Sequence, residues 1–447
     1  MGKEFPENST VKESRFKNIY RSLKYKNFRY FFYGQSISLI GTWMQRIATP
    51  WLVYSLTDSV FLLGLVGFAG QIPTFLIAPF AGVLIDRWNR YTILIITQIL
   101  AMIQALVLAF LFFDKSIEVW HIMLLSIFLG CINAFDMPAR QSFVVDMIEK
   151  REDLGNAIAL NSSMVNSARL IGPSVAGVLI SLTGEGMCFL VNGLSYIFVI
   201  TFLLMMKIPP KKERKKYTPV FQELKEGFLY TFRSLPIRYI ILLLALVSLM
   251  GMPYTVLMPV FAKNIIHGGP HTFGFLMGAS GIGALIAAIY MASRKSVLGL
   301  GKILPRFAAL FGVGLIAFSQ SSIFLLSLIL MLVVGAGMIM QMTSSNTILQ
   351  TIVDDDKRGR VMSFYTMAFM GTAPFGSLLA GYLASVVGAP NTLRIGGICC
   401  ILGAIVYSRK LPEIKRSIRP IYIRLGIISE VNAGIQSATE LTGRPKG

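Results

Sequence analysis

The stretch ARLIGPSVAG (residues 168–177) lies inside a long apolar run over residues 157–182. It combines a charged Arg169 with the pair Gly172-Pro173, and a helix surrounded by lipid should disfavour both features. Runs of similar length recur along the 447 residues, of which 54% are hydrophobic and only 14% charged. A hydrocarbon layer about 30 Å thick requires about 20 apolar residues per spanning helix. The sequence therefore predicts an integral membrane protein with many spanning helices.

Twelve such runs are predicted to cross the membrane, in two groups of six. Their expected ranges are 28–55, 60–82, 91–113, 119–145, 157–182, 187–207, 238–262, 272–293, 303–320, 321–350, 361–386 and 391–411. Only the polar residues 319–322 divide the ninth run from the tenth. The predicted fold class is an all-α membrane protein with two six-helix pseudo-repeats. Its expected parts are a cytoplasmic N-terminal segment 1–27, an N-terminal half 28–207, a basic linker 208–237, a C-terminal half 238–411 and a cytoplasmic tail 412–447.

The formal net charge of +20 first suggests nucleic-acid binding, but the positions of the charges argue against it. With the N-terminus inside, the outward loops carry only Lys115 and Lys263 as basic residues. The inward loops carry many more, including KKERKK (211–216) and DDDKRGR (354–360). This asymmetry orients a membrane protein without implying a partner. We therefore expect both termini in the cytoplasm and no nucleic-acid partner.

Residues for hydrolytic or metal chemistry are not arranged in a recognisable motif. The four cysteines lie within or at the ends of the predicted spans, without a CxxC pair. The three histidines fall near the outer surface, without metal-ligand spacing, and no nucleophile elbow or phosphate loop is present. The sequence thus predicts no enzyme activity, no cofactor and no metal site.

The longest interruption between apolar runs, residues 207–238, contains a proline pair and a basic cluster. Within it, apolar residues that share one side of a helix recur at positions 220, 221, 224, 228 and 232. This stripe predicts a helix that either lies on the inner leaflet or forms a solvated linker.

A short internal repeat relates the two halves. AGVLISLTG (176–184) aligns with AGYLASVVG (380–388) at an offset of 204 residues, with five of nine positions identical. The match falls on equivalent runs, the fifth and the eleventh. Two six-span halves joined by a long cytoplasmic loop form a known transporter architecture, with the substrate near the bilayer midplane between them.

GVLIDRWNR (82–90) stands between the second and third runs and resembles the G-x-L-x-D-R-x-G-R loop signature of the major facilitator superfamily. The matching residues are Gly82, Leu84, Asp86, Arg87 and Arg90. Asn89 replaces the usual glycine and Tyr91 a second basic residue, although asparagine also tolerates a left-handed backbone. The resemblance implies the twelve-helix fold of that superfamily.

This loop is expected to act as a gate on the cytoplasmic side, formed by Gly82, Asp86, Arg87 and Arg90. An aspartate is favoured near a helix N-terminus, and arginine forms charge-assisted bonds to carboxylates of neighbouring helices. The resemblance implies that Asp86 and Arg90 hold the halves closed there, with Asp146 as a candidate partner. The alternative is a simple positive-inside bias, which leaves Gly82 and Asp86 unexplained.

ARLIGPSVAG resembles the G-x-x-x-G-P-x-x-G-G motif that proton-coupled exporters of the superfamily carry in span five. Gly172, Pro173 and Gly177 match, whereas Ala168 and Ala176 stand where glycines are usual. Small residues allow helices to approach closely, and protein packing satisfies the carbonyl that proline frees. The resemblance implies that span five packs against span eight across the two halves, and that the chain is an exporter. General small-residue packing is the alternative.

A wider resemblance covers nearly the whole chain. The stretches 41–57, 133–163, 358–384 and 418–427 look like the enterobactin-exporter-like branch of the superfamily, also called transmembrane secretion effectors. Members of this branch are assigned to siderophores, macrolides and other compounds, so the resemblance implies efflux without fixing the substrate. It also implies location in the bacterial cytoplasmic (inner) membrane.

Charged residues inside the predicted spans are further candidates for function, because the bilayer centre disfavours charge. Arg46 lies near the middle of span one, with Thr42 on its side of the helix and Gln35 three turns away. Arg169 lies in span five. Such residues are expected to face a water-filled cavity, where the two arginines would attract an anionic or catecholate substrate.

Asp136 and Arg140 are one helical turn apart in span four and can pair. Burial favours a protonated carboxyl and a neighbouring arginine favours an ionised one. A substrate that competes for Arg140 would therefore change the protonation of Asp136. The intramembrane charges either bind substrate and carry protons or form a permanent structural network between spans one, four and five.

We therefore expect a monomeric secondary active exporter of a small organic molecule, driven by proton antiport through rocking of the two halves. Its expected partners are the small-molecule substrate, protons and the lipid bilayer. A broad macrolide-type drug efflux pump is the main alternative, and a nutrient importer or a non-transporting membrane sensor are the others. Substrate charge separates the first two, because a cavity rich in arginine disfavours cationic drugs.

Overall fold

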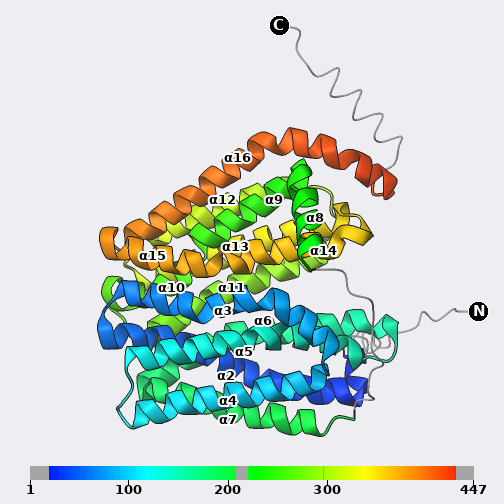
Figure 1. Cartoon of the computed structure of the whole chain (residues 1–447). Helices are drawn as coiled ribbons and strands as arrows, with labels where there is room; N and C mark the ends of the chain where they lie inside the picture. The colour runs from blue at the N-terminus through cyan, green and yellow to red at the C-terminus, as the bar shows by residue number, and fades with distance from the viewer. Residues whose placement is uncertain (1–19, 208–219, 295, 429–447) are drawn as a thin grey trace, which may run out of the picture.

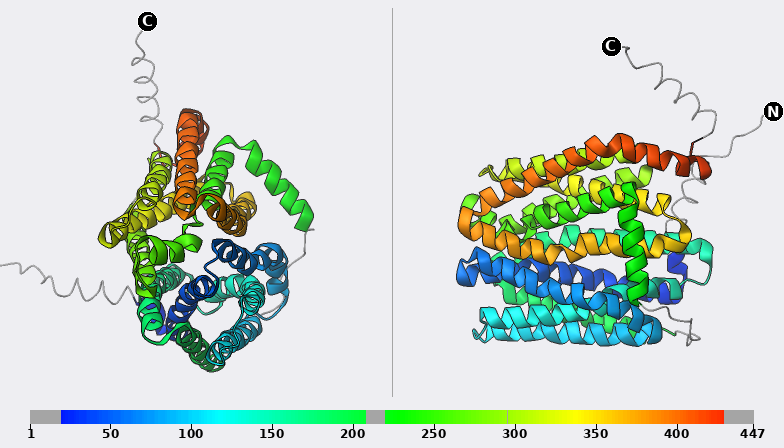
Figure 2. Two further views of the ribbon diagram at one scale, coloured as in Figure 1. Left: turned by 90° about the vertical axis from the view of Figure 1, so that its left-hand side faces the viewer. Right: turned by 45° about the horizontal axis from the view of Figure 1, so that its top comes forward.

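The computed structural model describes residues 20–207, 220–294 and 296–428, apart from the side chains of residues 78, 79, 82, 83, 86, 87, 151, 220–226, 355 and 356. Every regular element in these ranges is a helix, which confirms the predicted all-α class. Most of the helices run roughly parallel, in two bundles that lie side by side (Figures 1 and 2).

The first bundle follows a short helical turn, η1 (Arg21–Lys24). Its helices are α2 (Lys26–Thr57), α3 (Val60–Arg87), α4 (Arg90–Phe113), α5 (Val119–Asp146), α6 (Arg151–Thr183) and α7 (Glu185–Leu204). α2 packs against α6 and α7, whereas α4 packs against α5 and α7. α3 packs against α5.

The second bundle follows α8 (Val220–Arg233), a separate helix that spans the positions of the predicted stripe. Its elements are α9 (Leu235–Leu246), η2 (Val247–Gly251), α10 (Tyr254–Val260), η3 (Phe261–Ile265), α11 (Pro270–Ser293), α12 (Leu300–Phe318), α13 (Phe324–Ile352), α14 (Asp355–Thr366), η4 (Met367–Gly371), α15 (Ala373–Val387) and α16 (Ala389–Arg424). α13 packs against α11 and α12, and α16 packs against α12 and α9.

Eleven helical stretches in the described ranges are long and apolar enough to cross a membrane. The first predicted span, α2, is not one of them, although it is 32 residues long. Gln35, Gln45 and Arg46 interrupt its apolar sequence and lower its mean hydropathy. α2 nevertheless packs inside the first bundle, so the arrangement agrees with the predicted twelve-helix fold.

The seventh and eleventh predicted spans are each broken by π-helical turns, η2 and η3 in the seventh and η4 in the eleventh. Pro253 and Pro259 lie in the seventh, and proline cannot donate a backbone hydrogen bond. In the eleventh, η4 ends at Gly371 and Pro374 follows in the first turn of α15. Such local sequences disfavour a regular helix and favour π turns or kinks.

The internal repeat has a structural counterpart. Gly184 ends α6 with a φ angle of 83°, and Gly388 ends α15 with a φ angle of 84°. Only glycine adopts this left-handed backbone without a steric penalty from Cβ. The two aligned stretches therefore end their helices in the same way.

Two helix pairs make the largest contacts between the bundles: α6 packs against α11, and α3 packs against α15. At both seams the backbones meet at glycines. A Cβ at Gly177 would lie 2.8 Å from the carbonyl oxygen of Pro270, and one at Gly381 would lie 2.7 Å from the Cα of Gly64. These distances leave no room for a side chain, as is usual where membrane helices pack closely. The expected packing of span five against span eight is confirmed.

Both ends of the described chain lie at the same end of the bundles (Figure 1). This end, called the basic end below, carries η1 and the connections that contain Lys150 and Arg294. At the opposite end an ion pair joins the two bundles, because Lys263 Nζ lies 2.6 Å from Asp58 Oδ1.

Two further contacts join the bundles beside this ion pair. Asn264 donates a hydrogen bond to the Tyr54 hydroxyl at 2.6 Å. The rings of Trp51 and Phe273 stack with centroids 6.1 Å apart. The bundles therefore meet through both polar and aromatic contacts at the end opposite the basic end.

Close glycine packing within the second bundle predicts a specific loss of stability. A methyl group at Gly283 would overlap the carbonyl oxygen of Leu332, and that backbone atom cannot move away alone. We expect Gly283→Ala to lower the free energy of unfolding by about 1–3 kcal/mol. Thermal unfolding of the purified protein in detergent measures the effect.

The matched control is Gly359→Ala in α14, where nothing lies within 4 Å of an added Cβ. There alanine should leave the stability unchanged or raise it by up to about 1 kcal/mol, because alanine favours helix over glycine. Equal melting temperatures for Gly283→Ala and the wild-type protein would contradict the packing shown here.

Candidate functional site

Two arginines from different helices lie over the same indole ring. The guanidinium carbon of Arg46 in α2 is 4.7 Å from the ring centre of Trp43, and that of Arg169 in α6 is 5.2 Å from it. Cation–π attraction stabilises each charge without neutralising it. Among the described residues, no carboxylate forms an ion pair with either arginine.

Gly172 explains how Trp43 comes to lie between the two helices. A Cβ at Gly172 would overlap the Cβ of Trp43, so α6 approaches α2 closely only because this position lacks a side chain. One turn before it on α6, Arg169 then reaches the same ring. The glycine of ARLIGPSVAG thus positions both the tryptophan and the second arginine.

The arginine pair borders the junction between the bundles. Arg46 is exposed although it lies well inside α2, and Arg169 is half-buried. Arg46 lies close enough to Arg140 and Arg169 for their positive charges to repel one another. Arg169 also interacts electrostatically with the Tyr254 hydroxyl of the second bundle. An exposed arginine at this depth is tolerated only where it reaches water, because contact with lipid is costly. The arrangement therefore creates a region of positive charge that an anion can neutralise.

Asp136 lies close to this region but is surrounded by donors. The carboxyl is 2% exposed and forms the expected ion pair with Arg140. Gln98 Nε2 donates to Asp136 Oδ1 at 2.7 Å, and Thr97 Oγ1 lies 3.1 Å from the same oxygen. Thr97 and Gln98 come from α4 and were missed by sequence reasoning, although they are a polar pair within an apolar run.

A second polar network lies inside the first bundle. Gln45 donates to Gln104 at 2.9 Å and accepts a hydrogen bond from Asn192 at 2.7 Å, and all three residues are buried. Their bonds join α2, α4 and α7. Buried amides that hydrogen-bond to one another stabilise helix association in an apolar surrounding. Consecutive residues of α2 therefore serve different purposes, with Gln45 inside the bundle and Arg46 at the region of positive charge.

Gln35 and Thr42 were predicted to line the substrate cavity beside Arg46. Gln35 is 2% exposed, and its amide nitrogen has no hydrogen-bond partner among the described residues. Thr42 is half-buried, donates to the carbonyl of Ser38 at 3.0 Å and lies 3.5 Å from the Tyr196 hydroxyl. Among the described residues, neither Gln35 nor Thr42 forms a hydrogen bond with Arg46 or Arg169, so their cavity role stays a prediction.

The predicted gate lies at the basic end and is only partly described. Arg90 Nη1 at the start of α4 lies 3.2 Å from Asp146 Oδ2 at the end of α5. The expected pair is therefore present, but this contact joins two helices of one bundle. The side chains of Asp86 and Arg87 and the surroundings of Gly82 lie outside what the structure describes, so bridging between the halves stays a prediction.

A buried carboxylate at the basic end was missed by sequence reasoning. Asp153 is fully buried and forms ion pairs with Arg21 and with Lys24, whose Nζ lies 2.6 Å away. Tyr25 also donates to it at 2.7 Å. The hydrogen bond to Asp153 raises the pKa of Lys24. These contacts hold the start of the described chain against the first turn of α6.

Sequence comparison agrees with the architecture. The family model for transmembrane secretion effectors matches residues 18–421. The chain is 27% identical to the staphyloferrin A transporter of Staphylococcus aureus, over 86% of this chain and 96% of that protein. It is 24% identical to macrolide efflux protein A of Streptococcus pyogenes, over the same shares of the two chains.

Solved structures share the fold at low sequence identity. An inward-facing bacterial homologue of the human lysosomal transporter Spinster superposes with a TM-score of 0.67 at 14% identity, over 88% of this chain and 98% of that chain. An inward-facing bacterial homologue of the iron transporter ferroportin gives 0.65 at 17% identity, over 86% and 98%. The relatives are membrane transporters rather than enzymes. The chain belongs to the transmembrane secretion effector family, which consists of multi-pass transporters of the major facilitator type.

Proposed function

We propose that this transporter exports a small anionic organic molecule from the cytoplasm in exchange for protons. The observation that carries the proposal is the arginine pair on Trp43, two cations without a carboxylate partner among the described residues. Charged groups at this depth are costly unless they bind something of opposite charge. The similarity to the staphyloferrin A transporter of Staphylococcus aureus favours siderophores among the possible anions.

Alternating access supplies the transport step of the proposal. The Asp58–Lys263 ion pair and the Tyr54–Asn264 hydrogen bond hold the bundles together at the end opposite the basic end. Under the positive-inside rule the basic end faces the cytoplasm of a bacterial cell. The substrate would reach Arg46 and Arg169 from that side and leave after the opposite-end contacts separate.

Proton coupling would run through Asp136. In this conformation Arg140 forms an ion pair with Asp136, and its positive charge also acts on that of Arg46. A bound anion would attract Arg140 away from Asp136, and a buried carboxyl that loses its cationic partner binds a proton more readily. Substrate binding and proton binding would thereby be linked through one arginine, which acts as a positioning residue.

A macrolide-type drug pump is the second candidate function. It is supported by the similarity to macrolide efflux protein A, which spans as much of the chain as the similarity to the siderophore transporter. Substrate charge separates the two candidates, because unpaired arginines favour anions and repel cations. Proteoliposomes under an imposed pH gradient, tested with staphyloferrin A, a catecholate siderophore, a macrolide and a cationic dye, decide between them.

Removal of one arginine charge tests the proposed substrate site. Arg46→Gln and Arg169→Gln should each raise the KM for an anionic substrate by about 10- to 100-fold, because each removes a charge-assisted hydrogen bond worth about 1.5–3 kcal/mol. Initial export rates in proteoliposomes measure the effect. Arg306→Gln, at an exposed position of α12, is the matched control. Unchanged KM values in both test variants would make the arginines structural.

Removal of the Asp136 carboxylate tests proton coupling. Asp136→Asn should abolish accumulation driven by the pH gradient while leaving exchange of substrate between the two sides of the membrane intact, because asparagine cannot carry a proton. Asp114→Asn, at the exposed end of α4, is the control and should behave as wild type. Gradient-driven accumulation at the wild-type level in Asp136→Asn would remove this residue from proton coupling.

Charge reversal tests the ion pair at the end opposite the basic end. Asp58→Lys should increase labelling of a cysteine placed at Ser174 by about two- to fivefold, because exposed ion pairs contribute up to about 1 kcal/mol. Ser174 lies at the α6–α11 seam, against Gly278. The exchange Asp58→Lys/Lys263→Asp should restore slow labelling, measured in a cysteine-free background with a membrane-impermeant maleimide. Failure of the double variant to restore it would assign the effect to something other than the pair.

A further inference from the structure

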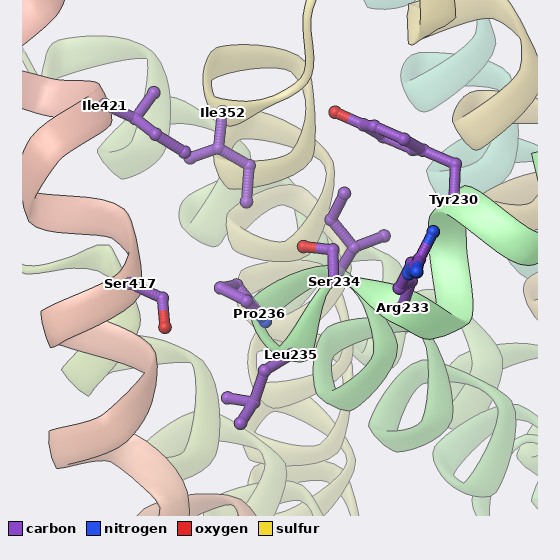
Figure 3. Close-up of a pocket in the computed structure, with 9 residues that line it drawn as sticks. Tyr230, Arg233, Ser234, Leu235, Pro236, Ile352, Ser417 and Ile421 are labelled. Carbon is purple, nitrogen blue, oxygen red and sulfur yellow. The ribbon is translucent and has the colours of Figure 1, made fainter.

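A cavity of about 340 Å³ lies at the basic end of the second bundle, away from the arginine pair. Its walls come from α8, the start of α9, the end of α13 and the last turns of α16 (Figure 3). The polar groups in the lining are Tyr230, Arg233, Ser234 and Ser417, and the apolar side includes Leu235 and Ile421. The volume falls within the range of roughly 300–1,000 Å³ that small-molecule sites occupy.

The walls of this cavity are held together by a chain of polar contacts. Tyr230 of α8 donates to Asp354 Oδ2 at 3.5 Å, and Arg424 at the end of α16 pairs with Asp354 Oδ1 at 2.9 Å. Lys357 lies 4.8 Å from the centre of the Tyr230 ring. The ring extends over the cavity toward Ile352 (Figure 3). The cavity is therefore a built feature, formed where three separate segments are tied together.

The charge of the cavity is positive. Arg233 is the charged residue of the lining, and among the described residues no carboxylate pairs with it. The neighbouring end of α16 adds a strong excess of basic over acidic side chains, because Glu413 is its one acidic residue. The basic residues there are Arg409, Lys410, Lys415, Arg416, Arg419 and Arg424. A ligand for this site must therefore carry negative charge, and hydroxyls of Ser234 and Ser417 can donate to it.

The position of the cavity restricts the ligand further. α8 runs across the direction of the spanning helices at the basic end, in both views (Figures 1 and 2). Its Phe228 and Leu229 are 49% and 57% exposed, as expected for a helix that lies in the membrane interface. Leu235 begins the next span directly beside Arg233. The cavity thus has a cationic group at the level of lipid headgroups and apolar side chains on the hydrocarbon side.

We propose that this cavity binds the phosphate-containing headgroup of an acidic glycerophospholipid from the inner leaflet. Arg233 pairs with the phosphate, the serine hydroxyls donate to its oxygens or to the glycerol, and the acyl chains pass along Leu235 into the bilayer. Basic pockets between membrane helices on the cytoplasmic side are known to select anionic lipids. Since the ligand contacts both α8 and α16, it fixes the helix that precedes the second bundle against α16.

Thermal unfolding of the full-length protein in a neutral detergent tests this proposal. Short-chain phosphatidylglycerol, short-chain phosphatidylcholine and inorganic phosphate are titrated separately. The variants are Arg233→Gln, Arg233→Lys and the control Lys302→Gln, which removes one exposed positive charge at the same end of the bundle, outside the cavity lining. Gel filtration and the melting temperature without lipid show whether each variant is folded.

We expect phosphatidylglycerol, but not phosphatidylcholine, to raise the melting temperature of the wild-type protein and of Lys302→Gln. In Arg233→Gln the apparent Kd should weaken about tenfold or more, as expected when a charge-assisted hydrogen bond is lost. Arg233→Lys should bind with an intermediate Kd. Equal weakening in Lys302→Gln would overturn the proposal in favour of non-specific surface charge, and an equal response to inorganic phosphate would identify a free anion as the ligand instead.

Discussion

Close approach of backbones at positions without a Cβ is the constraint on which the remaining structure depends. Lipid provides little hydrophobic drive for helices to associate, so packing contacts must supply it. Gly177 against Pro270 and Gly64 against Gly381 bring the two bundles together. Gly172 admits Trp43 between α2 and α6, and Trp43 in turn holds Arg46 and Arg169. The placement of charge therefore follows from the placement of glycine.

The charges inside the membrane-spanning helices are stabilised in two different ways. Asp136 is surrounded by Arg140, Gln98 and Thr97, so its charge is compensated locally and needs no ligand. Arg46 and Arg169 are stabilised by an aromatic face, which attracts a cation but leaves its net charge in place. A compensated anion beside uncompensated cations gives the first bundle a positive interior. Among the described residues, the second bundle offers no comparable charges at that depth, which is why the proposed substrate and proton steps both lie in the first.

Sequence reasoning predicted what is encoded in local patterns. The apolar runs gave the helices, the four-residue spacing gave the Asp136–Arg140 pair, and Gly172 with Gly177 indicated the seam between spans five and eight. It missed Trp43, which looks like an ordinary apolar residue until Gly172 of a distant helix lies against it. It also missed Asp153, because the cations that surround it come from a segment about 130 residues earlier. Contacts of this kind depend on how helices are arranged in space, which periodicity does not contain.

The π-helical turns of the seventh span have a geometric consequence. Each residue of an α-helix advances the side-chain direction by about 100°, so a turn that holds an extra residue rotates everything after it. α9, before η2, packs against α16 and α13 of its own bundle, whereas α10, after it, packs against α3 and α2 of the other bundle as well as against α15 and α11 of its own. The seventh span thus turns one stripe of side chains toward its neighbours in α9 and a different stripe in α10. The π-helical turn changes the direction in which the following side chains point. One chain segment can therefore pack within both bundles.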